Sequence, residues 1–205
     1  MNAKQFFSYI RYTLFPIAVY GIAIGLATGT IIWGYSLAAE FIGEQSANIY
    51  AFFRANPSFI PLLFLGLLAL ALVSYFVIKF VPEVTGSGVP YSEGVMRGLL
   101  PLRWVIVLPA MIINSFISFI AGIPLGSEGP SVLIGSCIGA GSNDVTINGN
   151  KPRLAWKRQS ITGGASAAFA VAFNAPLAGI IFALEEIHKR FSPMILLPAS
   201  ASVIV

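Results

Sequence analysis

Two short segments of the sequence combine glycine, serine and proline in the same order. They read Gly86-Ser87-Gly88-Val89-Pro90 and Gly126-Ser127-Glu128-Gly129-Pro130. Because proline favours the first turn of a helix, each segment predicts a helix that begins at a glycine-rich turn. The free N–H groups of such a start, with the positive end of the helix dipole, bind anions without a fixed cation, and serine adds a hydroxyl donor. Two broken helices of this kind are typical of a membrane anion pathway. An ordinary cytoplasmic turn is the alternative for residues 86–90.

Glu128 is isolated in a long stretch without charge. The 24 residues before it and the 15 residues after it carry none. A short acidic side chain at such a depth cannot reach water by snorkelling, so the default hypothesis is a role in an ion or proton path. A carboxylate at a helix start also imitates a bound anion, and protonation would release it. We therefore expect Glu128 to be both gate and proton carrier. The alternative is a glutamate that only caps its own helix.

A second acidic feature is the pair Glu185 and Glu186, which follows 26 uncharged residues and precedes the basic residues Lys189 and Arg190. Acids beside a basic turn at an interface often form surface ion pairs of little energetic value. Successive residues of a helix point about 100° apart, however. One carboxylate can therefore face a loop while the other faces the protein interior, and both interpretations stay open.

These residues must be positioned by the elements around them, and six stretches of sequence contain no charge: residues 12–39, 55–78, 104–127, 129–143, 159–184 and 191–205. About 20 apolar residues cross the hydrocarbon layer of a bilayer. Four stretches are long enough, and the two of 15 residues predict re-entrant or truncated helices. A helix of that length reaches only about 22 Å, so the one after Glu128 is expected to begin inside the membrane. The spacing of Gly21, Gly25 and Gly29 predicts close packing of the first helix.

Composition excludes several classes of protein. The 205 residues include only 12 Lys+Arg and 8 Asp+Glu, and 57% are hydrophobic. An ordinary soluble domain has about 25% charged residues, so a soluble globular protein is excluded. The net charge of +4 is dispersed among apolar stretches, which argues against binding to nucleic acid. The single cysteine, Cys137, and the single histidine, His188, exclude an intrachain disulfide and a multi-histidine metal site.

A different class of function, an intramembrane hydrolase, would use Ser87 or Ser127 as its nucleophile. A nucleophilic serine needs a base to take its proton. His188, the only histidine, is predicted at the cytoplasmic interface, remote from both glycine motifs. The sequence therefore argues against a hydrolase.

Basic residues orient the chain, because Lys and Arg collect in cytoplasmic loops. With a cytoplasmic N-terminus, the first span carries residues 40–54 to the outside and the second returns to Lys79. Of the 12 basic residues, only Arg54 then lies outside. We expect an integral membrane protein with its N-terminus in the cytoplasm.

The two glycine-proline motifs, with the run Ala172-Phe173-Asn174-Ala175-Pro176-Leu177-Ala178-Gly179 and the pair Glu185-Glu186, resemble those of the chloride channel (CLC) family of anion channels and anion/proton antiporters. The order and spacing match over nearly the whole chain. The resemblance implies an all-α integral membrane fold of inverted-repeat architecture, with tilted, broken and re-entrant helices, of which residues 1–205 form the first repeat only. It also implies a homodimer in a bacterial inner membrane, with a separate pathway in each subunit.

By this resemblance, Ser87 is similar to the serine that contacts the central anion. The turns around it and before Glu128 would complete the anion-binding site with Gly86, Gly88, Gly126, Ser127 and Gly129. Glu128 is similar to the gating glutamate, Glu186 to the intracellular proton-transfer glutamate, and Glu185 to its neighbour at the inner proton entry. An acid at position 186 favours chloride/proton exchange over the alternative, a passive voltage-gated-type chloride channel. Ser87 favours chloride, with nitrate as a second candidate, over fluoride. Chloride and protons are carried as substrates, and no cofactor is expected.

Two features depart from the family's pattern. Ser127 stands where the family usually has Arg or Lys, which is expected to reduce the enrichment of anions at the outer mouth while keeping the amide donors. The family's second half contributes a Gly-x-Phe-x-Pro motif and a tyrosine to the anion site, and residues 1–205 contain no such motif. We expect the N-terminal half of a longer transporter, which does not transport by itself. A membrane scaffold or a non-transporting half-subunit is the alternative.

Overall fold

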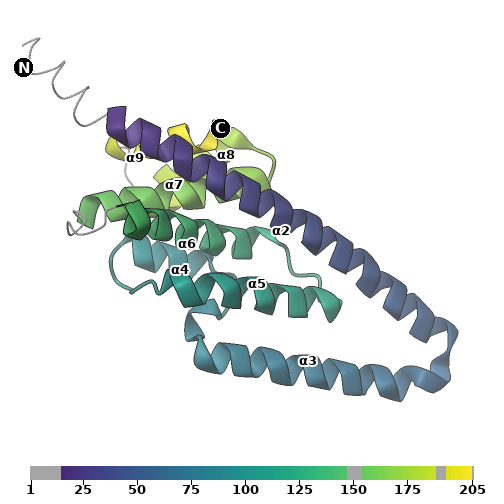
Figure 1. Cartoon of the computed structure of the whole chain (residues 1–205). Helices are drawn as coiled ribbons and strands as arrows, with labels where there is room; N and C mark the ends of the chain where they lie inside the picture. The colour runs from purple at the N-terminus through teal and green to yellow at the C-terminus, as the bar shows by residue number, and fades with distance from the viewer. Residues whose placement is uncertain (1–14, 147–153, 188–192, 205) are drawn as a thin grey trace, which may run out of the picture.

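The computed structural model describes residues 15–146, 154–187 and 193–204, and the regular structure in these ranges is entirely helical. The α-helices, labelled in Figure 1, are α2 (Phe15–Ala55), α3 (Ile60–Phe80), α4 (Val89–Met96), α5 (Trp104–Ile120), α6 (Glu128–Thr146), α7 (Leu154–Ala172), α8 (Pro176–Phe182) and α9 (Pro193–Val203). Short helical turns lie at η2 (Pro57–Phe59), η3 (Pro82–Val84) and η4 (Ala183–Ile187), the last of which has the wider π-helical geometry. The predicted all-α class is confirmed.

The first helix is much longer than the uncharged stretch that predicts it. Helix α2 has 41 residues and continues through Glu40, Glu44 and Arg54. At 1.5 Å per residue it is about 60 Å long, twice the ~30 Å of a hydrocarbon core. The helix therefore continues well beyond the uncharged residues 12–39. Polar residues after that point do not break the helix, because Glu, Gln and Ala are all good helix formers.

The stretch 159–184 is not one span but two helices. Helix α7 ends at Ala172, the backbone of Asn174 has the left-handed φ of 50°, and α8 begins at Pro176. Proline disfavours a helical residue before it, and asparagine tolerates the left-handed region, so the chain breaks here. Helix α8 folds back on α7, since a Cβ on Gly179 would lie 2.5 Å from the carbonyl oxygen of Ser166.

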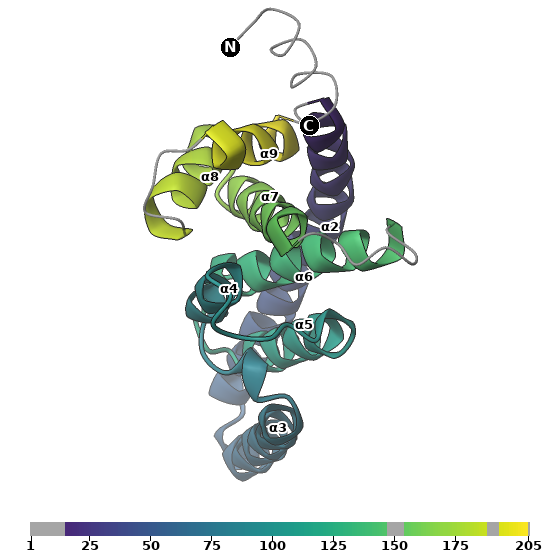
Figure 2. The ribbon, with the colours of Figure 1, turned by 90° about the vertical axis from the view of Figure 1, so that its left-hand side faces the viewer.

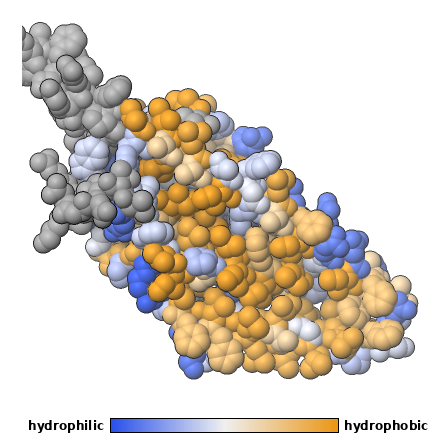
Figure 3. All heavy atoms as spheres, in the orientation of Figure 1, coloured by the Kyte–Doolittle hydropathy of each residue, from blue (hydrophilic) through white to orange (hydrophobic). Residues whose placement is uncertain are grey.

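The sequence predicts four full spans. Within the described residues, by contrast, two helical segments are long and apolar enough to cross a membrane, namely Ala18–Ala55 and Pro57–Phe80. The stretch 104–127 forms the 17-residue helix α5 and then a loop. Helix α6 has 19 residues and so is longer than the uncharged stretch 129–143, because it also includes the charged residues Glu128 and Asp144 at the two ends of that stretch. Helix α3 buries none of its side chains. Figure 3 shows an apolar band between more hydrophilic ends of the molecule.

Helix α6 lies at the centre of the fold. Figure 2 shows it between α7 and α5, with α4 beside it, and α6 is in contact with each of these three helices. Glycine allows α6 and α7 to touch through their backbones: a Cβ on Gly135 would lie 2.3 Å from the carbonyl oxygen of Gly164. The buried core beside α6 includes Ile32 of α2, Met111 of α5 and Leu133 of α6 itself. This packing holds the start of α6 at a fixed place between α2 and α5.

The glycine face of α2 packs closely, as the sequence predicts. A Cβ on Gly25 would lie 2.2 Å from the carbonyl oxygen of Ser202 in α9, and one on Gly21 would lie 3.0 Å from the Cβ of Ala201. At Gly29 the nearest atom, in Val171 of α7, would be 4.0 Å away. Bare backbone at the first two positions therefore sets the spacing between α2 and α9.

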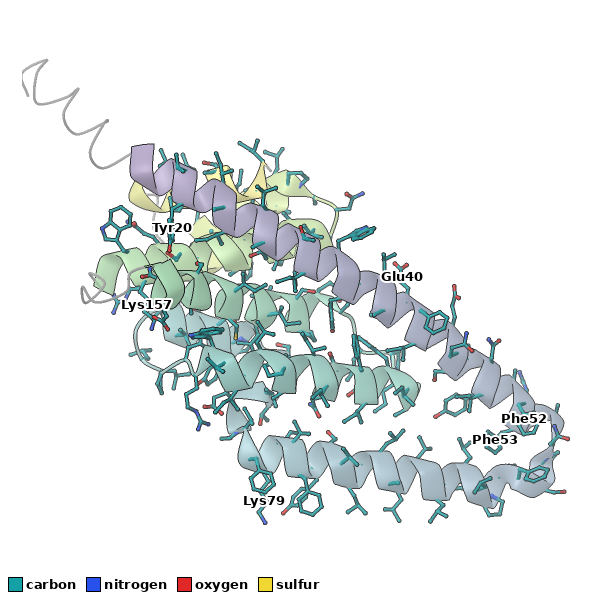
Figure 4. All side chains as sticks on the ribbon, viewed as in Figure 1. Tyr20, Glu40, Phe52, Phe53, Lys79 and Lys157 are labelled. Carbon is teal, nitrogen blue, oxygen red and sulfur yellow. The ribbon has the colours of Figure 1, made fainter. Side chains whose placement is uncertain are left out.

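Polar side chains join the helices at one end of the molecule. Figure 4 shows Lys79 and Lys157 at this end, and Phe52 and Phe53 at the opposite end, where α2 meets α3. Asp144 of α6 accepts a hydrogen bond from Trp104 Nε1 at 2.8 Å and faces Lys157 Nζ at 3.3 Å. Six basic residues of the topology prediction lie outside the described ranges: Lys4, Arg11, Lys151, Arg153, Lys189 and Arg190.

Candidate functional site

The two glycine-proline motifs meet in the structure. A Cβ on Gly129 would lie 2.5 Å from the carbonyl oxygen and 3.0 Å from the Cβ of Ser87. A Cβ on Gly88 would lie 3.2 Å from the carbonyl oxygen of Gly129 and 2.9 Å from the Cβ of Leu133. No side chain fits between these segments, so the starts of α4 and α6 touch through bare backbone. The six predicted anion-site residues, namely Gly86, Ser87, Gly88, Gly126, Ser127 and Gly129, therefore belong to one region.

The turn before α4 depends on glycine. Gly86 has φ 80° and Gly88 has φ 85°, both in the left-handed region that side chains disfavour. Gly88 is the N-cap of α4, and its carbonyl oxygen accepts the amide of Ser92 at 3.0 Å. Ser87, between the two glycines, is exposed. Its hydroxyl is thus presented at a helix start whose first-turn amides have no partner within the helix.

The start of α6 is fixed by its neighbours on α2. Ser46 donates a hydrogen bond to the carbonyl oxygen of Ile120 at 3.1 Å, and Tyr50 donates one to that of Ala121 at 2.6 Å. These bonds fasten the end of α5 and the loop that leads to Ser127. The carbonyl oxygen of Ser127 then accepts both the amide and the hydroxyl of Ser131, at 3.1 Å and 2.7 Å. The first amides of α6 have no partner within the helix.

Glu128 begins α6 and is half-buried. Its side chain turns back over Gly126, because a Cβ on that glycine would overlap the Oε2 atom. No hydrogen bond or ion pair joins its carboxylate to another described residue. A half-buried carboxylate without a fixed partner at a helix start can exchange with another anion or accept a proton.

An open hollow of about 700 Å³ lies beside Glu128. It is bounded by α2, by the loop from Gly122 to Ser127 and by the end of α7 near Asn174. The charged residues among those that line it are Glu40 and Glu128, both acidic. Ser127 also lines it and contributes no positive charge. The electrostatic field of these side chains therefore favours protons over anions at this entrance.

A smaller cavity of about 60 Å³ lies between the two motifs and was not expected from the sequence. Gly86 and Gly126 line it from the two helix starts, and α5 adds the polar side chains of Asn114, Ser115 and Ser118. It is large enough for ordered water, which needs at least about 10–15 Å³ of such space. Three polar residues close together within an apolar stretch are the sequence signal that could have identified it.

An ion pair between the buried Glu83 and the exposed Arg103 supports the turn before α4. Arg103 Nη2 and Nε lie 2.6 Å and 2.7 Å from the same oxygen of Glu83, which is 8% exposed. Glu83 is in η3, three residues before Gly86, and Arg103 is the N-cap of α5. The pair joins the turn before α4 to α5, the helix that lines the small cavity.

The pair Glu185 and Glu186 lies on η4, after the break that separates α8 from α7. Ala183 of η4 packs with Val95 and Met96 at the C-terminal end of α4, whereas Ser87 precedes its N-terminal end. Glu185 is exposed, and the side chain of Glu186 lies outside the described part, as does His188. The structure thus places these acids away from Glu128 along α4. Among the described residues no three His, Cys, Asp or Glu side chains form a group that could hold a metal.

Comparison with known families identifies a match over residues 69–205 to the family described as voltage gated chloride channel. This range contains both glycine-proline motifs and the acidic pair. It is about two thirds of the chain.

Curated relatives match most of the chain. The H(+)/Cl(-) exchange transporters ClcA of Salmonella typhimurium and of Salmonella arizonae are each 38% identical to it over 183 residues, covering 86% of this chain. The match covers only 37% of each relative. The chain therefore spans little more than a third of the length of these relatives.

Solved structures share the fold. A slow cyanobacterial Cl-/H+ antiporter has a TM-score of 0.77 and 31% sequence identity, over 92% of this chain and 45% of its own. A eukaryotic CLC transporter has a TM-score of 0.70 and 23% sequence identity, and the match covers 38% of that transporter's chain. A CLC-type fluoride/proton antiporter has a TM-score of 0.68 and 21% identity, and the match covers 46% of its chain. At those identities the likeness concerns the fold alone.

Proposed function

Because the chain belongs to the voltage-gated chloride channel family, we propose that it is the first half of a chloride/proton exchange transporter. The relatives named as H(+)/Cl(-) exchange transporters and the cyanobacterial Cl-/H+ antiporter support exchange rather than passive conduction. In this proposal residues 1–205 form the first inverted repeat of an integral membrane protein. A second repeat would supply the Gly-x-Phe-x-Pro motif and the tyrosine of the anion site.

The observation that carries the proposal is the contact between Ser87 and Gly129. It brings two helix starts together with Glu128 beside them. Chloride would be bound by the Ser87 hydroxyl and by the free amides around Gly86, Gly88, Gly126, Ser127 and Gly129. Backbone amides at helix starts hold an anion without a fixed cation, so the ion can also leave.

Glu128 would couple chloride to protons by competing with the anion. In its ionised form the carboxylate occupies the helix start and excludes chloride. When it takes a proton it loses its charge and its affinity for the amides, so chloride enters and the proton moves with the side chain. Glu186 would pass the proton to and from the cytoplasm, with Glu185 at the inner entry. Their place at the far end of α4 from Ser87 supports a proton route that differs from the anion route.

We further propose a cytoplasmic N-terminus, a bacterial inner membrane and a homodimer with one pathway in each subunit. In Figure 4, Lys79 and Lys157 lie at the same end of the molecule, opposite the junction of α2 and α3. Because Lys and Arg collect in cytoplasmic loops, this arrangement supports the proposed orientation. Glu128 and the hollow would then open to the outside, and η4 to the cytoplasm.

The test is coupled transport by the native full-length protein in lipid vesicles. An outward chloride gradient should drive protons uphill into the vesicles, in a fixed ratio to the chloride released. Chloride release without uphill proton movement would show a passive channel and contradict the exchange mechanism. Vesicles that release no chloride at all would contradict anion transport itself.

A further inference from the structure

The small cavity between the two glycine-proline motifs collects the polar side chains of an otherwise apolar helix. Three polar residues follow Trp104 in α5, namely Asn114, Ser115 and Ser118. All three line the cavity, together with Gly86 and Gly126. A helix turns by about 100° per residue, so positions 114, 115 and 118 lie on one side of it. Buried polar groups need hydrogen-bond partners, and the bonds that these residues already make show what the cavity offers to a ligand.

The two serines can only accept a hydrogen bond from a ligand in the cavity. The Ser115 hydroxyl donates its proton to the carbonyl oxygen of Ile112 at 2.9 Å, and the Ser118 hydroxyl donates to that of Asn114 at 3.1 Å. A hydroxyl has one proton and two lone pairs. Both serine oxygens therefore keep lone pairs that can accept, and they have no further proton to give.

Asn114 offers the opposite kind of group, a donor. Its side-chain oxygen accepts a hydrogen bond from Ser74 of α3 at 2.7 Å, which leaves the Nδ2 amide with its two protons. This nitrogen has no hydrogen-bond partner among the described residues. An unpaired amide in an apolar helix is unfavourable, because its hydrogen bond to water is lost and nothing replaces it. The side chain therefore requires an acceptor, and the cavity is the space that it lines.

The glycines that line the cavity also lack partners. No backbone carbonyl in the described ranges accepts the amide of Gly86 or that of Gly126. A Cβ on Gly86 would meet no atom within 4 Å, so the backbone has open space on that side. The next residue, Ser87, is in close contact with Gly129. The turn before α4 is thus packed against α6 at Ser87 and is not supported by direct packing at Gly86.

A ligand that completes these groups must both accept and donate hydrogen bonds. Water does so, and the cavity of about 60 Å³ exceeds the ~10–15 Å³ that one molecule needs. Chloride can only accept, so it would face the lone pairs of two serine oxygens, and none of the described lining residues is basic. The hollow beside Glu128 is a source of water, since the two spaces share Phe119, Leu125 and Gly126 in their linings.

We propose that the cavity is a site for ordered water, which joins the polar side chains of α5 to the backbone at Gly86 and Gly126. Water accepts from the Asn114 amide and the glycine amides and donates to the serine oxygens. Asn114 is then a positioning residue for the anion site, because the water that it holds supports the turn carrying Ser87. The positioning role rests on the chloride site proposed above, whereas the water site does not depend on it.

Crystals of the native full-length protein, grown in bromide in place of chloride, test the water site. Bromide is located by its anomalous X-ray scattering, which water lacks. We expect density about 2.7–3.2 Å from Asn114 Nδ2 and from the oxygen of Ser115 or Ser118, without an anomalous peak. An anomalous peak in the cavity would identify an anion site, and a cavity without density would be dry. Either result overturns the inference.

Asn114→Leu tests the positioning role, because leucine has a similar volume and no amide. The water density should disappear, and the chloride dissociation constant should rise about two- to tenfold in a calorimetric titration, which is the effect of one hydrogen bond. Ser74→Ala is the matched control, since it removes the other hydrogen bond of the same side chain and leaves the cavity amide. It should lower the Tm by weakening the docking of α3, while the water density and the chloride affinity stay the same.

Unchanged chloride affinity in Asn114→Leu after loss of the water would remove the positioning role. An equal loss of affinity in Ser74→Ala would assign the effect to the packing of α3 instead. If Asn114→Leu does not fold, Ser118→Ala replaces it: this variant removes one acceptor and should lower the water occupancy and the chloride affinity, and an unchanged affinity would refute the role. A native protein that binds no chloride would contradict the proposed function, and with it the positioning role, but the crystallographic result for the water site would stand.

Discussion

The carbonyl oxygen of Ser87 lies 2.5 Å from the point that a Cβ on Gly129 would occupy. This contact joins a loop residue before α4 to the second residue of α6. It brings the two glycine-proline motifs together, and it exists only because Gly129 has no side chain. With the similar close approach at Gly88, the geometry of the proposed site depends on bare backbone at both glycines.

Gly129→Ala should separate the two helix starts and weaken chloride binding. Alanine is otherwise favourable in a helix, so a loss reports the contact with Ser87 and not helix propensity. Overpacking of this kind costs about 1–3 kcal/mol, which, if it falls on the bound state, corresponds to roughly a 5- to 150-fold rise in the chloride dissociation constant. Calorimetric titration with chloride measures it. Gly66→Ala on α3, where the added methyl meets only open space, is the control; equal affinity in the two variants would disprove the steric argument.

Glu128→Gln should abolish proton coupling and leave chloride flux. The amide cannot take up or release a proton, and it resembles the protonated glutamate that has left the anion site. Simultaneous recording of chloride release and external pH from vesicles measures both fluxes. Retention of the normal proton-to-chloride ratio in this variant would remove Glu128 from the proton path.

Glu186→Gln should remove proton movement while sparing chloride flux, because η4 lies at the other end of α4 from the anion motif. The same vesicle recording applies. Glu44→Gln, an equal change on α2 that does not line the hollow beside Glu128, is the control and should keep full coupling. If Glu186→Gln exchanges protons as well as the control does, the inner proton acceptor lies elsewhere.

Ser127→Arg should raise anion flux at low ionic strength. The hollow beside Glu128 has two acidic lining residues and no basic one, and an arginine would reverse part of this field. The increase should be a few-fold at low salt and should fade near physiological salt, where charges are screened beyond about 8 Å. Ser127→Gln tests the effect of size without charge. Flux that does not change at low ionic strength would count against this electrostatic explanation.

Gly25→Ala should destabilise the packing of α2 on α9. The added methyl would lie 2.2 Å from the carbonyl oxygen of Ser202, so the helices must move apart at a cost of about 1–3 kcal/mol. Thermal unfolding in detergent should show a lower Tm. Gly34→Ala, on the same helix with open space around it, should show no loss. Equal Tm values for both variants would mean that α9 adjusts without cost.

Local signals in the sequence predicted where helices begin better than they predicted how long the helices are. Pro90 and Pro130 correctly mark the starts of α4 and α6, because proline acts within one turn. Asn174 and Pro176 break the stretch 159–184 although it contains no charge, because their backbone preferences act within a few residues. The continuation of α2 past Glu40 has no such marker, since a polar residue can extend a helix beyond the membrane.

The sequence by itself determined the membrane class, the two helix starts and the isolation of Glu128, because each follows from residues adjacent in the chain. Only the tertiary structure decided that Ser87 touches Gly129 and that Asn114, Ser115 and Ser118 of α5 line a small cavity between the two helix starts. These relationships depend on how α4, α5 and α6 pack, and that packing is set by contacts between residues far apart in the chain.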